Sequence, residues 1–237
     1  MENQLEGMQF PISEDELIER YEKNVFTAVV HDTIRKLGFH EPIALPLYLK
    51  PVVLGQRLCG PAFTVKGAPW KRIDIDFDDD ERHKEMDTRS RCMSEYYHNC
   101  VPIWDCSGDM YHAQYGEMMS AQSMVLGCRG AIVDGGARDS ERIVEMGFKV
   151  WYRYLTPTPM INFKILDWQV PIIVGDVVIN PGDILFADRD GIVCIPRKMA
   201  YEVLLKAEEE VSTEKSWREI IAEKLDPKES YKRGVLF

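Results

Sequence analysis

The chain has 237 residues, of which 45% are hydrophobic and 29% are charged, and its formal net charge at pH 7 is -10. These fractions are typical of a soluble globular protein, and the length allows a large buried core. The negative charge argues against a general binder of nucleic acid or of anionic membranes. A membrane span needs about 18 consecutive apolar residues, and we find no such run. The first residues, MENQLEGMQF, are not expected to form a signal peptide.

The six cysteines are scattered, and none belongs to a C-x-x-C pair. A disulfide framework or a structural zinc site is therefore not expected. We predict free thiols in a reducing cytoplasm. Cys59, Cys128 and Cys194 stand beside apolar runs and are predicted to be small core residues.

The first third of the chain predicts two helices and a strand. Ser13 precedes three acidic residues, which is typical of a helix N-terminus, and this helix should run to about Lys23. A second helix is expected from Thr27 to a stop at Gly38; the polar pair His31 and Asp32 on it fits an ordinary helix surface better than a site. Residues 58–66, LCGPAFTVK, predict a strand.

An acidic segment follows this strand. Residues 74–80 read DIDFDDD, and such a block is more often a solvated loop than a cation site. A helix is predicted for residues 81–97. Together, residues 71–99 are interpreted as an elaborated connection that could act as a lid over a site.

The next segment predicts a buried strand and a helix with an open N-terminus. Residues 101–106 predict the strand, and the helix begins with Glu117 after Gly116. The N–H groups of Met118 and Met119 would be free in its first turn and would attract an anion. Their side chains are expected to fill the core.

Residues 127–148 hold the stretch around which the chain is organised. Ala131 to Val133 predict a buried strand, which Asp134-Gly135-Gly136 should end in a tight turn. Asp139 or Ser140 is expected to cap a helix that ends at Gly147. Arg138 and Asp139 stand at the turn, where they offer an anion clamp and a hard oxygen ligand. The alternative is that Asp139 merely caps the helix and Arg138 merely pairs with it.

The remainder of the chain predicts β structure followed by a long helix. Residues 149–155 predict a strand, and apolar runs between turn signals make 170–196 an all-β region. A charged helix is expected over 198–225, with a break near Ser212, and its mixed surface suits solvent or a partner. Residues 226–237 form a tail.

Glu117 and Arg138 are separated by residues 118–137, which hold a predicted helix and strand. Such a unit returns the chain to the same edge of a sheet. Glu117, the amides of Met118 and Met119, Arg138 and Asp139 would then surround one pocket. A divalent metal held there could polarise an α-keto acid and stabilise an enolate, as aldol cleavage and β-keto acid decarboxylation require.

Several short motifs resemble those of the RraA-like family, which includes the class II 4-hydroxy-4-methyl-2-oxoglutarate / 4-carboxy-4-hydroxy-2-oxoadipate aldolases. The acid at 117, twenty residues and then Arg138-Asp139 match its acid-x20-Arg-Asp pattern. TAVVHD, LCGPAFTV, VDGGARD and INPGDILFADRDGIVCIP are similar to further family segments in the expected order. Together they cover most of Thr27 to Pro196.

The resemblance implies an α/β protein with a compact RraA-like swivelling β/β/α fold, N-terminal helices and a C-terminal helical extension. It implies one domain over 1–237, with a core of about 25–197 and the extension over 198–237. It also implies a homotrimer or homohexamer with sites between subunits. The implied activity is that of a Mg²⁺- or Mn²⁺-dependent aldolase with oxaloacetate decarboxylase side activity.

The family pattern also implies roles for individual residues. Arg138 would bind the pyruvyl group, and Asp139 would ligate the metal. Glu117 would hold a water that protonates the enolate. Gly116 and the amides of Met118 and Met119 would bind substrate. A C-terminal Glu from a neighbouring subunit would approach the metal, with Glu214 as the first candidate and Glu210 as the second.

Two departures from the family pattern concern the substrate. Aldolases often carry an acid where this chain has Arg142, and the acidic insertion replaces a loop near the substrate. A different keto acid or a sugar-acid derivative would suit these changes. Two alternatives therefore stand beside the lyase: a non-catalytic protein-binding regulator of the ribonuclease-E-inhibitor type, and a sugar-acid hydratase or isomerase with the same enolate chemistry.

Overall fold

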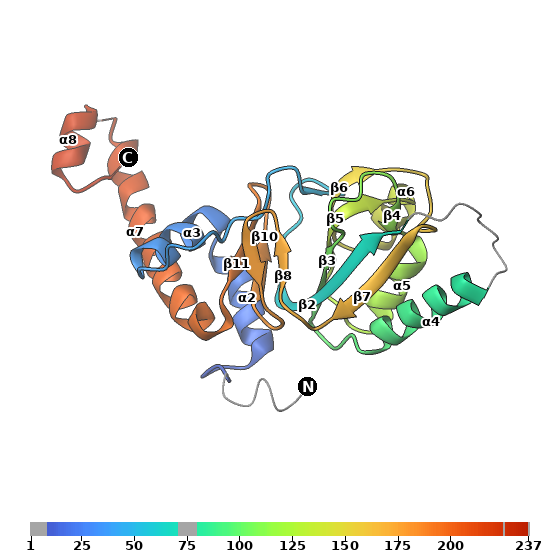
Figure 1. Ribbon diagram of the computed structural model, residues 1–237. Coiled ribbons are helices and arrows are strands. Elements are labelled where there is room, and N and C mark those ends of the chain that lie inside the picture. Colours follow the sequence, from blue (N-terminus) through green and yellow to red (C-terminus); the bar gives the residue numbers. More distant parts are fainter. Residues whose placement is uncertain (1–8, 71–79, 225, 237) are drawn as a thin grey trace.

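The protein is described by a computed structural model that places residues 9–70, 80–224 and 226–236. Its main sheet has the strand order β1-β6-β5-β3-β2-β10-β11, with β4 paired to β5 and β7 paired to β2, while β8 and β9 form a small second sheet. Figure 1 shows α4, α5 and α6 at one end of the molecule and α2, α3 and α7 at the other. The expected α/β class is thus confirmed.

The strands are β1 (Lys50–Pro51), β2 (Leu58–Pro69), β3 (Val101–Asp105), β4 (Ala113–Tyr115), β5 (Ala131–Ala137), β6 (Val150–Leu155), β7 (Phe163–Trp168), β8 (Ile172–Val174), β9 (Val177–Ile179), β10 (Ile184–Ala187) and β11 (Ile192–Ile195). The helices are α2 (Glu14–Asn24), α3 (Thr27–Lys36), α4 (Asp80–Ser94), α5 (Glu117–Val125), α6 (Ser140–Met146), α7 (Ala200–Ala222) and α8 (Pro227–Lys232), with a 3₁₀ turn, η1, at Arg197–Met199.

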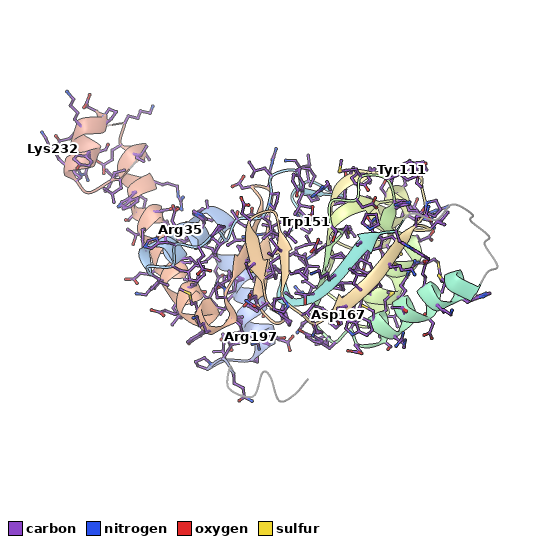
Figure 2. The ribbon with its side chains drawn as sticks, viewed as in Figure 1. Arg35, Tyr111, Trp151, Asp167, Arg197 and Lys232 are labelled. Carbon is purple, nitrogen blue, oxygen red and sulfur yellow. The ribbon has the colours of Figure 1, made fainter. Side chains whose placement is uncertain are left out.

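The centre of the sheet is parallel. β2, β3, β5 and β6 run in one direction, with Ile103 opposite Ile132 and Ile132 opposite Trp151. These side chains are fully buried, as expected for strands that are covered on both faces; Figure 2 shows Trp151 within the body of the molecule. Because the strands are parallel, their carboxyl ends lie at one edge, where ligands gather in α/β folds.

Three hydrophobic clusters hold the layers together. The first joins α2, α3 and α7 to β10 and β11, and includes the Tyr21 and Phe186 rings, whose centroids are 5.5 Å apart. The second lies between the parallel strands and α4, α5 and α6. The third packs the β8–β9 sheet against the other face of the strands. The burial of apolar side chains therefore places α5 and α6, the helices of the expected site, on one face of the parallel strands.

Local sequence explains some of the helix ends, and distant contacts explain others. Ser13 accepts the N–H of Glu16 over 3.1 Å, so the predicted cap of α2 is confirmed. α3 begins at Thr27, but its amide and hydroxyl donate to the distant Asp188 carboxylate over 2.8 and 2.7 Å. Gly147, with φ of +71°, ends α6 as predicted.

Three expectations about the elements were wrong or incomplete. The predicted tight turn at residues 134–136 was wrong, because β5 continues through it to Ala137. α7 is continuous over Ala200–Ala222, so the break near Ser212 was wrong as well. β4 and β7 were not anticipated, and the helix predicted for residues 81–97 spans Asp80–Ser94. Residues 74–79 of the acidic segment, and the start of the suggested lid, lie outside the described residues.

All six cysteines are buried free thiols, as predicted. The sulfurs of Cys100 and Cys128 are 3.5 Å apart. Burial raises the pKa of Cys92 to about 12, and it raises the pKa of the Cys59 and Cys194 thiols well above the usual value. These thiols therefore remain protonated and behave as core residues. Among the described helices, none combines the length and apolar character that crossing a membrane requires.

Candidate active site at the ends of β4 and β5

The end of β4 and the end of β5 are joined by the backbone. The N–H of Arg138 donates to the carbonyl of Tyr115 over 2.9 Å. Tyr115 is followed by Gly116 and the first turn of α5, and Arg138 by Asp139 and the first turn of α6. The structure therefore brings Gly116, Glu117, Arg138 and Asp139 together, as the sequence spacing predicted.

Asp139 connects the two helices through its side chain. Its Oδ2 accepts the N–H of Glu117 over 3.2 Å and lies 3.4 Å from Nε of Arg138. Asp139 stands at the N-cap position of α6, but its side chain makes no capping hydrogen bond there. Its φ of +55° turns it toward α5, and aspartate is one of the residues that tolerates this conformation. Of the alternative interpretation, the N-cap position of Asp139 and its pairing with Arg138 are thus present, whereas the side-chain capping bond to α6 is absent and the carboxylate contacts α5 instead.

Gly116 provides the space for this contact. A Cβ atom at position 116 would lie 2.8 Å from Oδ2 of Asp139 and 3.1 Å from Cγ of Arg138. The φ of Gly116 is -149°, which any residue adopts. The glycine is thus required for close approach and not for backbone freedom.

The first turn of α5 presents its amides beside Asp139. α5 begins at Glu117 and has no side-chain cap. The Glu117 side chain is half-buried, and Met119 packs against the second hydrophobic cluster. Met118 is 77% exposed, so the expectation that its side chain fills the core was wrong. The helix N-terminus carries a partial positive charge, which favours an anionic ligand at this position.

A cavity of about 350 Å³ opens beside these residues. Its lining consists of residues 137–140, at the end of β5 and the start of α6, and residues 155–157, at the end of β6. Glu117, Met118 and Met119 are not among the residues that line it, so only Arg138 and Asp139 of the predicted set face this cavity. The Arg138 and Asp139 side chains are 41% and 38% exposed, so both reach solvent. The volume is suited to a small acid of a few carbon atoms.

A buried ion pair supports the same edge of the sheet. Nε of Arg153 donates to Oδ1 of Asp134 over 2.9 Å, and Nη2 of Arg153 donates to the Tyr48 hydroxyl over 2.6 Å. The Arg153 guanidinium also lies 4.3 Å from the centre of the Tyr48 ring. Sequence reasoning missed this pair, although an acid inside VDGG and an arginine inside KVWYRYL on neighbouring strands were a usable signal.

The donor set at the candidate site suits a hard cation that keeps most of its waters. Among the described residues, no three Asp, Glu, His or Cys side chains converge as a metal cage made wholly of protein ligands would require. Mg²⁺ is usually held by one or two carboxylates together with water and substrate oxygens. Asp139 offers such a carboxylate, and its Oδ1 is outside the two contacts made by Oδ2. The residues present therefore fit this type of ion.

Glu214 does not join the site within one chain. It lies on α7, and Figure 1 shows α7 at the opposite end of the molecule from α5 and α6. Its carboxylate is 3.5 Å from Arg218 on the same helix. Glu210, the second candidate, pairs with Lys36 over 2.8 Å. A role for either residue at Asp139 would require a second copy of the chain.

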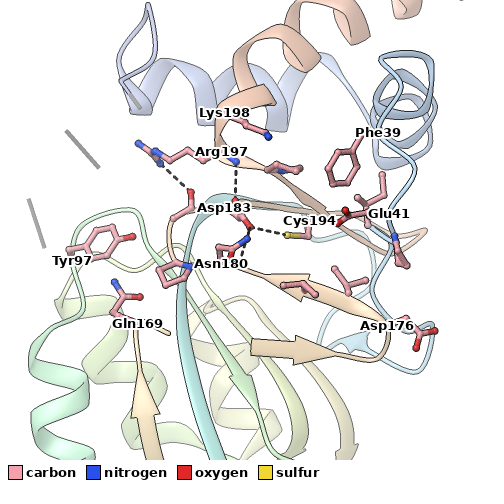
Figure 3. Close-up of a pocket in the computed structure, with 17 residues that line it drawn as sticks. Phe39, Glu41, Tyr97, Gln169, Asp176, Asn180, Asp183, Cys194, Arg197 and Lys198 are labelled. Carbon is pink, nitrogen blue, oxygen red and sulfur yellow. Dashed lines mark hydrogen bonds between the residues drawn. The ribbon is translucent and has the colours of Figure 1, made fainter. Parts of the chain in front are cut away.

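A larger cavity of about 760 Å³ lies elsewhere, between the β8–β9 sheet, η1 and the loop after α3 (Figure 3). Asp183 is the buried acid on its wall. Its oxygens accept the N–H groups of Asn180 and Arg197 over 2.9 and 3.0 Å. These bonds fix the turn before β10, so Asp183 has a structural role.

Comparison with known proteins identifies the family. The model of the RraA-like family, described as Aldolase/RraA, matches residues 27–194. The chain belongs to the RraA-like family. A protein of Halalkalibacterium halodurans named "Putative 4-hydroxy-4-methyl-2-oxoglutarate aldolase" is 27% identical over 175 residues, which are 74% of this chain and 77% of that protein. The resemblance drawn from the sequence motifs is thereby confirmed.

Solved structures agree on the RraA-like fold. A crystal structure described as "novel cellulases from microbes associated with the gut ecosystem" is 34% identical, covers 91% of this chain and 95% of its own, and has a TM-score of 0.79. Streptomyces coelicolor RraAS2, described as an unusual member of the RNase ES inhibitor RraA protein family, is 23% identical and covers 89% of this chain and 99% of its own, with a TM-score of 0.73. The expected fold is confirmed.

Proposed function

We propose that this RraA-like protein is a divalent-metal-dependent lyase that cleaves or decarboxylates an oxo-acid through a pyruvate-enolate-type intermediate. The observation that carries the proposal is the contact of Asp139 with both Arg138 and the first amide of α5, beside a cavity of about 350 Å³. A carboxylate ligand and an arginine at one small cavity, with a helix amide bonded to that carboxylate, are what a chelating oxo-acid needs. Similarity to the H. halodurans protein named "Putative 4-hydroxy-4-methyl-2-oxoglutarate aldolase" supports it.

Arg138 and the α5 amides would orient the substrate. The Arg138 guanidinium presents several donors in one plane, which match the carboxylate and carbonyl oxygens of a pyruvyl group. The N–H groups of Met118 and Met119 would donate to the same end of the substrate, where the partial charge of the helix favours an anion. These contacts also stabilise the negative charge that develops on the enolate oxygen.

Asp139 would hold Mg²⁺ or Mn²⁺, which when bound supplies a positive charge that polarises the substrate carbonyl. Glu117 stands at the first position of α5, next to the amide that contacts Asp139. Its carboxylate would hold a water molecule that gives a proton to the enolate carbon. In this proposal Arg138 binds the substrate, Asp139 ligates the cation, and Glu117 transfers the proton through a water molecule.

A homotrimer or homohexamer would complete the site. The C-terminal part of α7 projects away from the body of the chain, and Figure 1 shows it well separated from α6. Glu214 on this helix contacts the exposed Arg218, whereas Glu210 is already paired to α3 through Lys36. Glu214 from a second copy is therefore the better candidate for approaching Asp139, and Glu214→Gln should lower the affinity for Mn²⁺.

The alternatives explain fewer of these features. A protein-binding regulator, as the description of the S. coelicolor relative suggests for that protein, does not need an acid and an arginine at one cavity with a helix amide bonded to the acid. A sugar-acid hydratase or isomerase would use the same residues, and the basic Arg142 near the site leaves this substrate class open.

The test is pyruvate release from 4-hydroxy-4-methyl-2-oxoglutarate and from oxaloacetate, with Mg²⁺ or Mn²⁺ and with EDTA. Because metal ions alone decarboxylate oxaloacetate, a blank with metal and no protein is subtracted. We expect metal-dependent release that EDTA abolishes. Release from oxaloacetate alone would retain the enolate chemistry and move the search to other oxo-acids. Activity that survives EDTA, or no release from either compound and from sugar acids, would contradict the proposal.

A further inference from the structure

A buried carboxylate outside the candidate site connects the loop before β4 to the neighbouring strands. Asp109 is 5% exposed, and it follows a tight turn in which Ser107 and Gly108 have φ values of +48° and +74°. Its carboxylate accepts the backbone N–H groups of Tyr111 and His112 over 3.2 Å each. It also lies 3.1 Å from Nδ1 of His112. A single carboxylate therefore fixes the backbone that enters β4.

Gln114, in the middle of β4, bridges this carboxylate to β5. Its Nε2 donates to Oδ2 of Asp109, and its Oε1 accepts the N–H of Gly136 over 2.8 Å. The side chain is 1% exposed. A Cβ atom at Gly135 would lie 2.3 Å from Oε1 of Gln114, so the glycines of VDGG make room for this amide. Both ends of the Gln114 amide are thus used, and its position is fixed.

Tyr154 ties the same loop to β6. Its hydroxyl lies 3.0 Å from the carbonyl of His112 and 3.2 Å from the carbonyl of Asp109. The Tyr154 ring also occupies the space where a side chain at Gly136 would stand. Figure 2 shows the neighbouring Tyr111 at the outer edge of the molecule, on the side of β4 and α6. The network therefore spans the loop after β3, β4, β5 and β6.

We propose that Asp109, Gln114 and Tyr154 are positioning residues that set the first-turn amides of α5 against Arg138 and Asp139. The inference rests on the proposed function and adds residues that touch no substrate. Gln114 is followed directly by Tyr115, whose carbonyl holds the N–H of Arg138, and then by Gly116. A shift of β4 along β5 therefore moves the amides of 117–119 relative to Asp139. In a buried network such a shift follows when one partner is left unsatisfied.

The strand itself offers a matched control. Tyr115 points to the other face of β4, where its hydroxyl and that of Ser123 form a buried hydrogen bond of 2.6 Å. Gln114→Met removes the bridge to Asp109 and Gly136 with little change in volume. Ser123→Ala removes the partner of the Tyr115 hydroxyl, which lies in the last turn of α5, away from the first-turn amides. A general loss of stability would lower the activity of both variants, whereas loss of positioning would affect Gln114→Met alone.

The experiment compares the wild type, Gln114→Met and Ser123→Ala in three measurements: pyruvate release, binding of oxalate in the presence of Mg²⁺, and amide hydrogen exchange of residues 116–119. For Gln114→Met we expect kcat/KM to fall at least about tenfold, oxalate binding to weaken by a similar factor, and these amides to exchange faster. Ser123→Ala should stay within about twofold in all three. Equal effects in the two variants, or none in Gln114→Met, would overturn the proposal.

A further variant and a further comparison cover the cases in which Gln114→Met does not fold or the wild type shows no activity. If Gln114→Met does not fold, Tyr154→Phe removes one hydroxyl at the margin of the network and should change all three measurements in the same direction by smaller factors; unchanged values would overturn the proposal. If the wild type neither releases pyruvate nor binds oxalate, the proposed function fails, and hydrogen exchange alone decides the positioning role. Faster exchange at 116–119 in Gln114→Met but not in Ser123→Ala would still support it, and equal exchange would overturn it.

Discussion

The backbone N–H of Glu117 donates to Oδ2 of Asp139 over 3.2 Å. This bond joins the first residue of α5 to the residue before α6, so the Asp139 carboxylate is oriented by the start of α5. Nε of Arg138 lies 3.4 Å from the same oxygen. Both contacts are made by Oδ2, which leaves Oδ1 for a ligand such as a hydrated cation.

Substitution of Gly116 tests this contact by steric means. In Gly116→Ala the new methyl group would meet Oδ2 of Asp139 at 2.8 Å, while the backbone conformation remains accessible to alanine. We expect pyruvate release to fall by roughly ten- to a hundredfold, because misplacing a reacting group by about 1 Å has an effect of this size. The melting temperature should change little. Unchanged activity would show that Asp139 need not lie against α5.

The planar pair of N–H donors on the Arg138 guanidinium can be tested separately from the charge of the side chain. Arg138→Lys keeps a cation but loses the planar pair of donors, so kcat/KM should fall by about a hundredfold or more. Arg189→Lys, on an exposed turn, is the control and should match the wild type. Steady-state kinetics with both oxo-acids measure the difference. A lysine at 138 that works as well as arginine would exclude bidentate binding of the substrate.

The glycines of β5 allow a prediction about stability. A Cβ atom at Gly136 would lie 2.4 Å from the carbonyl oxygen of His112, which is backbone and cannot move aside easily. Gly136→Ala should therefore destabilise the protein by about 1–3 kcal/mol or more. Gly191→Ala, whose Cβ would have no atom within 4 Å, should have no such cost. Denaturant unfolding of both variants checks this, and equal stabilities would contradict the packing described for β5.

The ion pair between α2 and α7 makes stability depend on pH. The Arg20 side chain hydrogen-bonds Glu208, with Nε 3.0 Å from Oε1, and this holds the pKa of Glu208 below its ordinary value. A depressed pKa stabilises the fold above the unfolded value of about 4.3, and the stabilisation is lost as the pH falls through the folded pKa. At pH 7, Glu208→Gln should therefore destabilise the protein by about 1–2 kcal/mol, the range for a partly exposed charged hydrogen bond.

The difference between wild type and Glu208→Gln should shrink as the pH falls below about 4.3, because protonation makes the Glu208 side chain neutral like the glutamine that replaces it. Thermal melting above and below this pH measures it. Glu209→Gln, an exposed neighbour on α7, is the control and should be close to the wild type throughout. A difference in melting temperature that stays constant down to pH 3 would mean that the Arg20 pair contributes no charge-dependent stability.

Much of the site could be predicted because its information is local. Residues 118–137, which separate Glu117 from Arg138, form one helix and one strand. A unit of this kind returns the chain to the same edge of the sheet. The caps at Ser13 and Gly147 likewise depend on neighbours in sequence. The family resemblance, confirmed by the match over residues 27–194, supplied the residue roles, which remain proposals.

The parts that sequence reasoning missed depend on distant contacts. Asp134-Gly135-Gly136 suggested a turn, but the glycines are there because Gln114 and the His112 carbonyl approach β5 closely. Asp109 could not be selected among the many acids, since its partners are fixed only once β4 pairs with β5. Met118 was assigned to the core by its type, yet the direction of α5 turns it to solvent. The single-domain organisation over 1–237 stays a prediction.

The most direct test of the central claim is pyruvate release from 4-hydroxy-4-methyl-2-oxoglutarate by the wild type, Asp139→Asn and the control Asp176→Asn, each with Mg²⁺. Asp139→Asn preserves the shape of the side chain and removes the charge that would hold the cation. The account predicts release by the wild type and by Asp176→Asn, an exposed residue between β8 and β9, and a loss of about a hundredfold or more in Asp139→Asn. Equal release by all three proteins would contradict it.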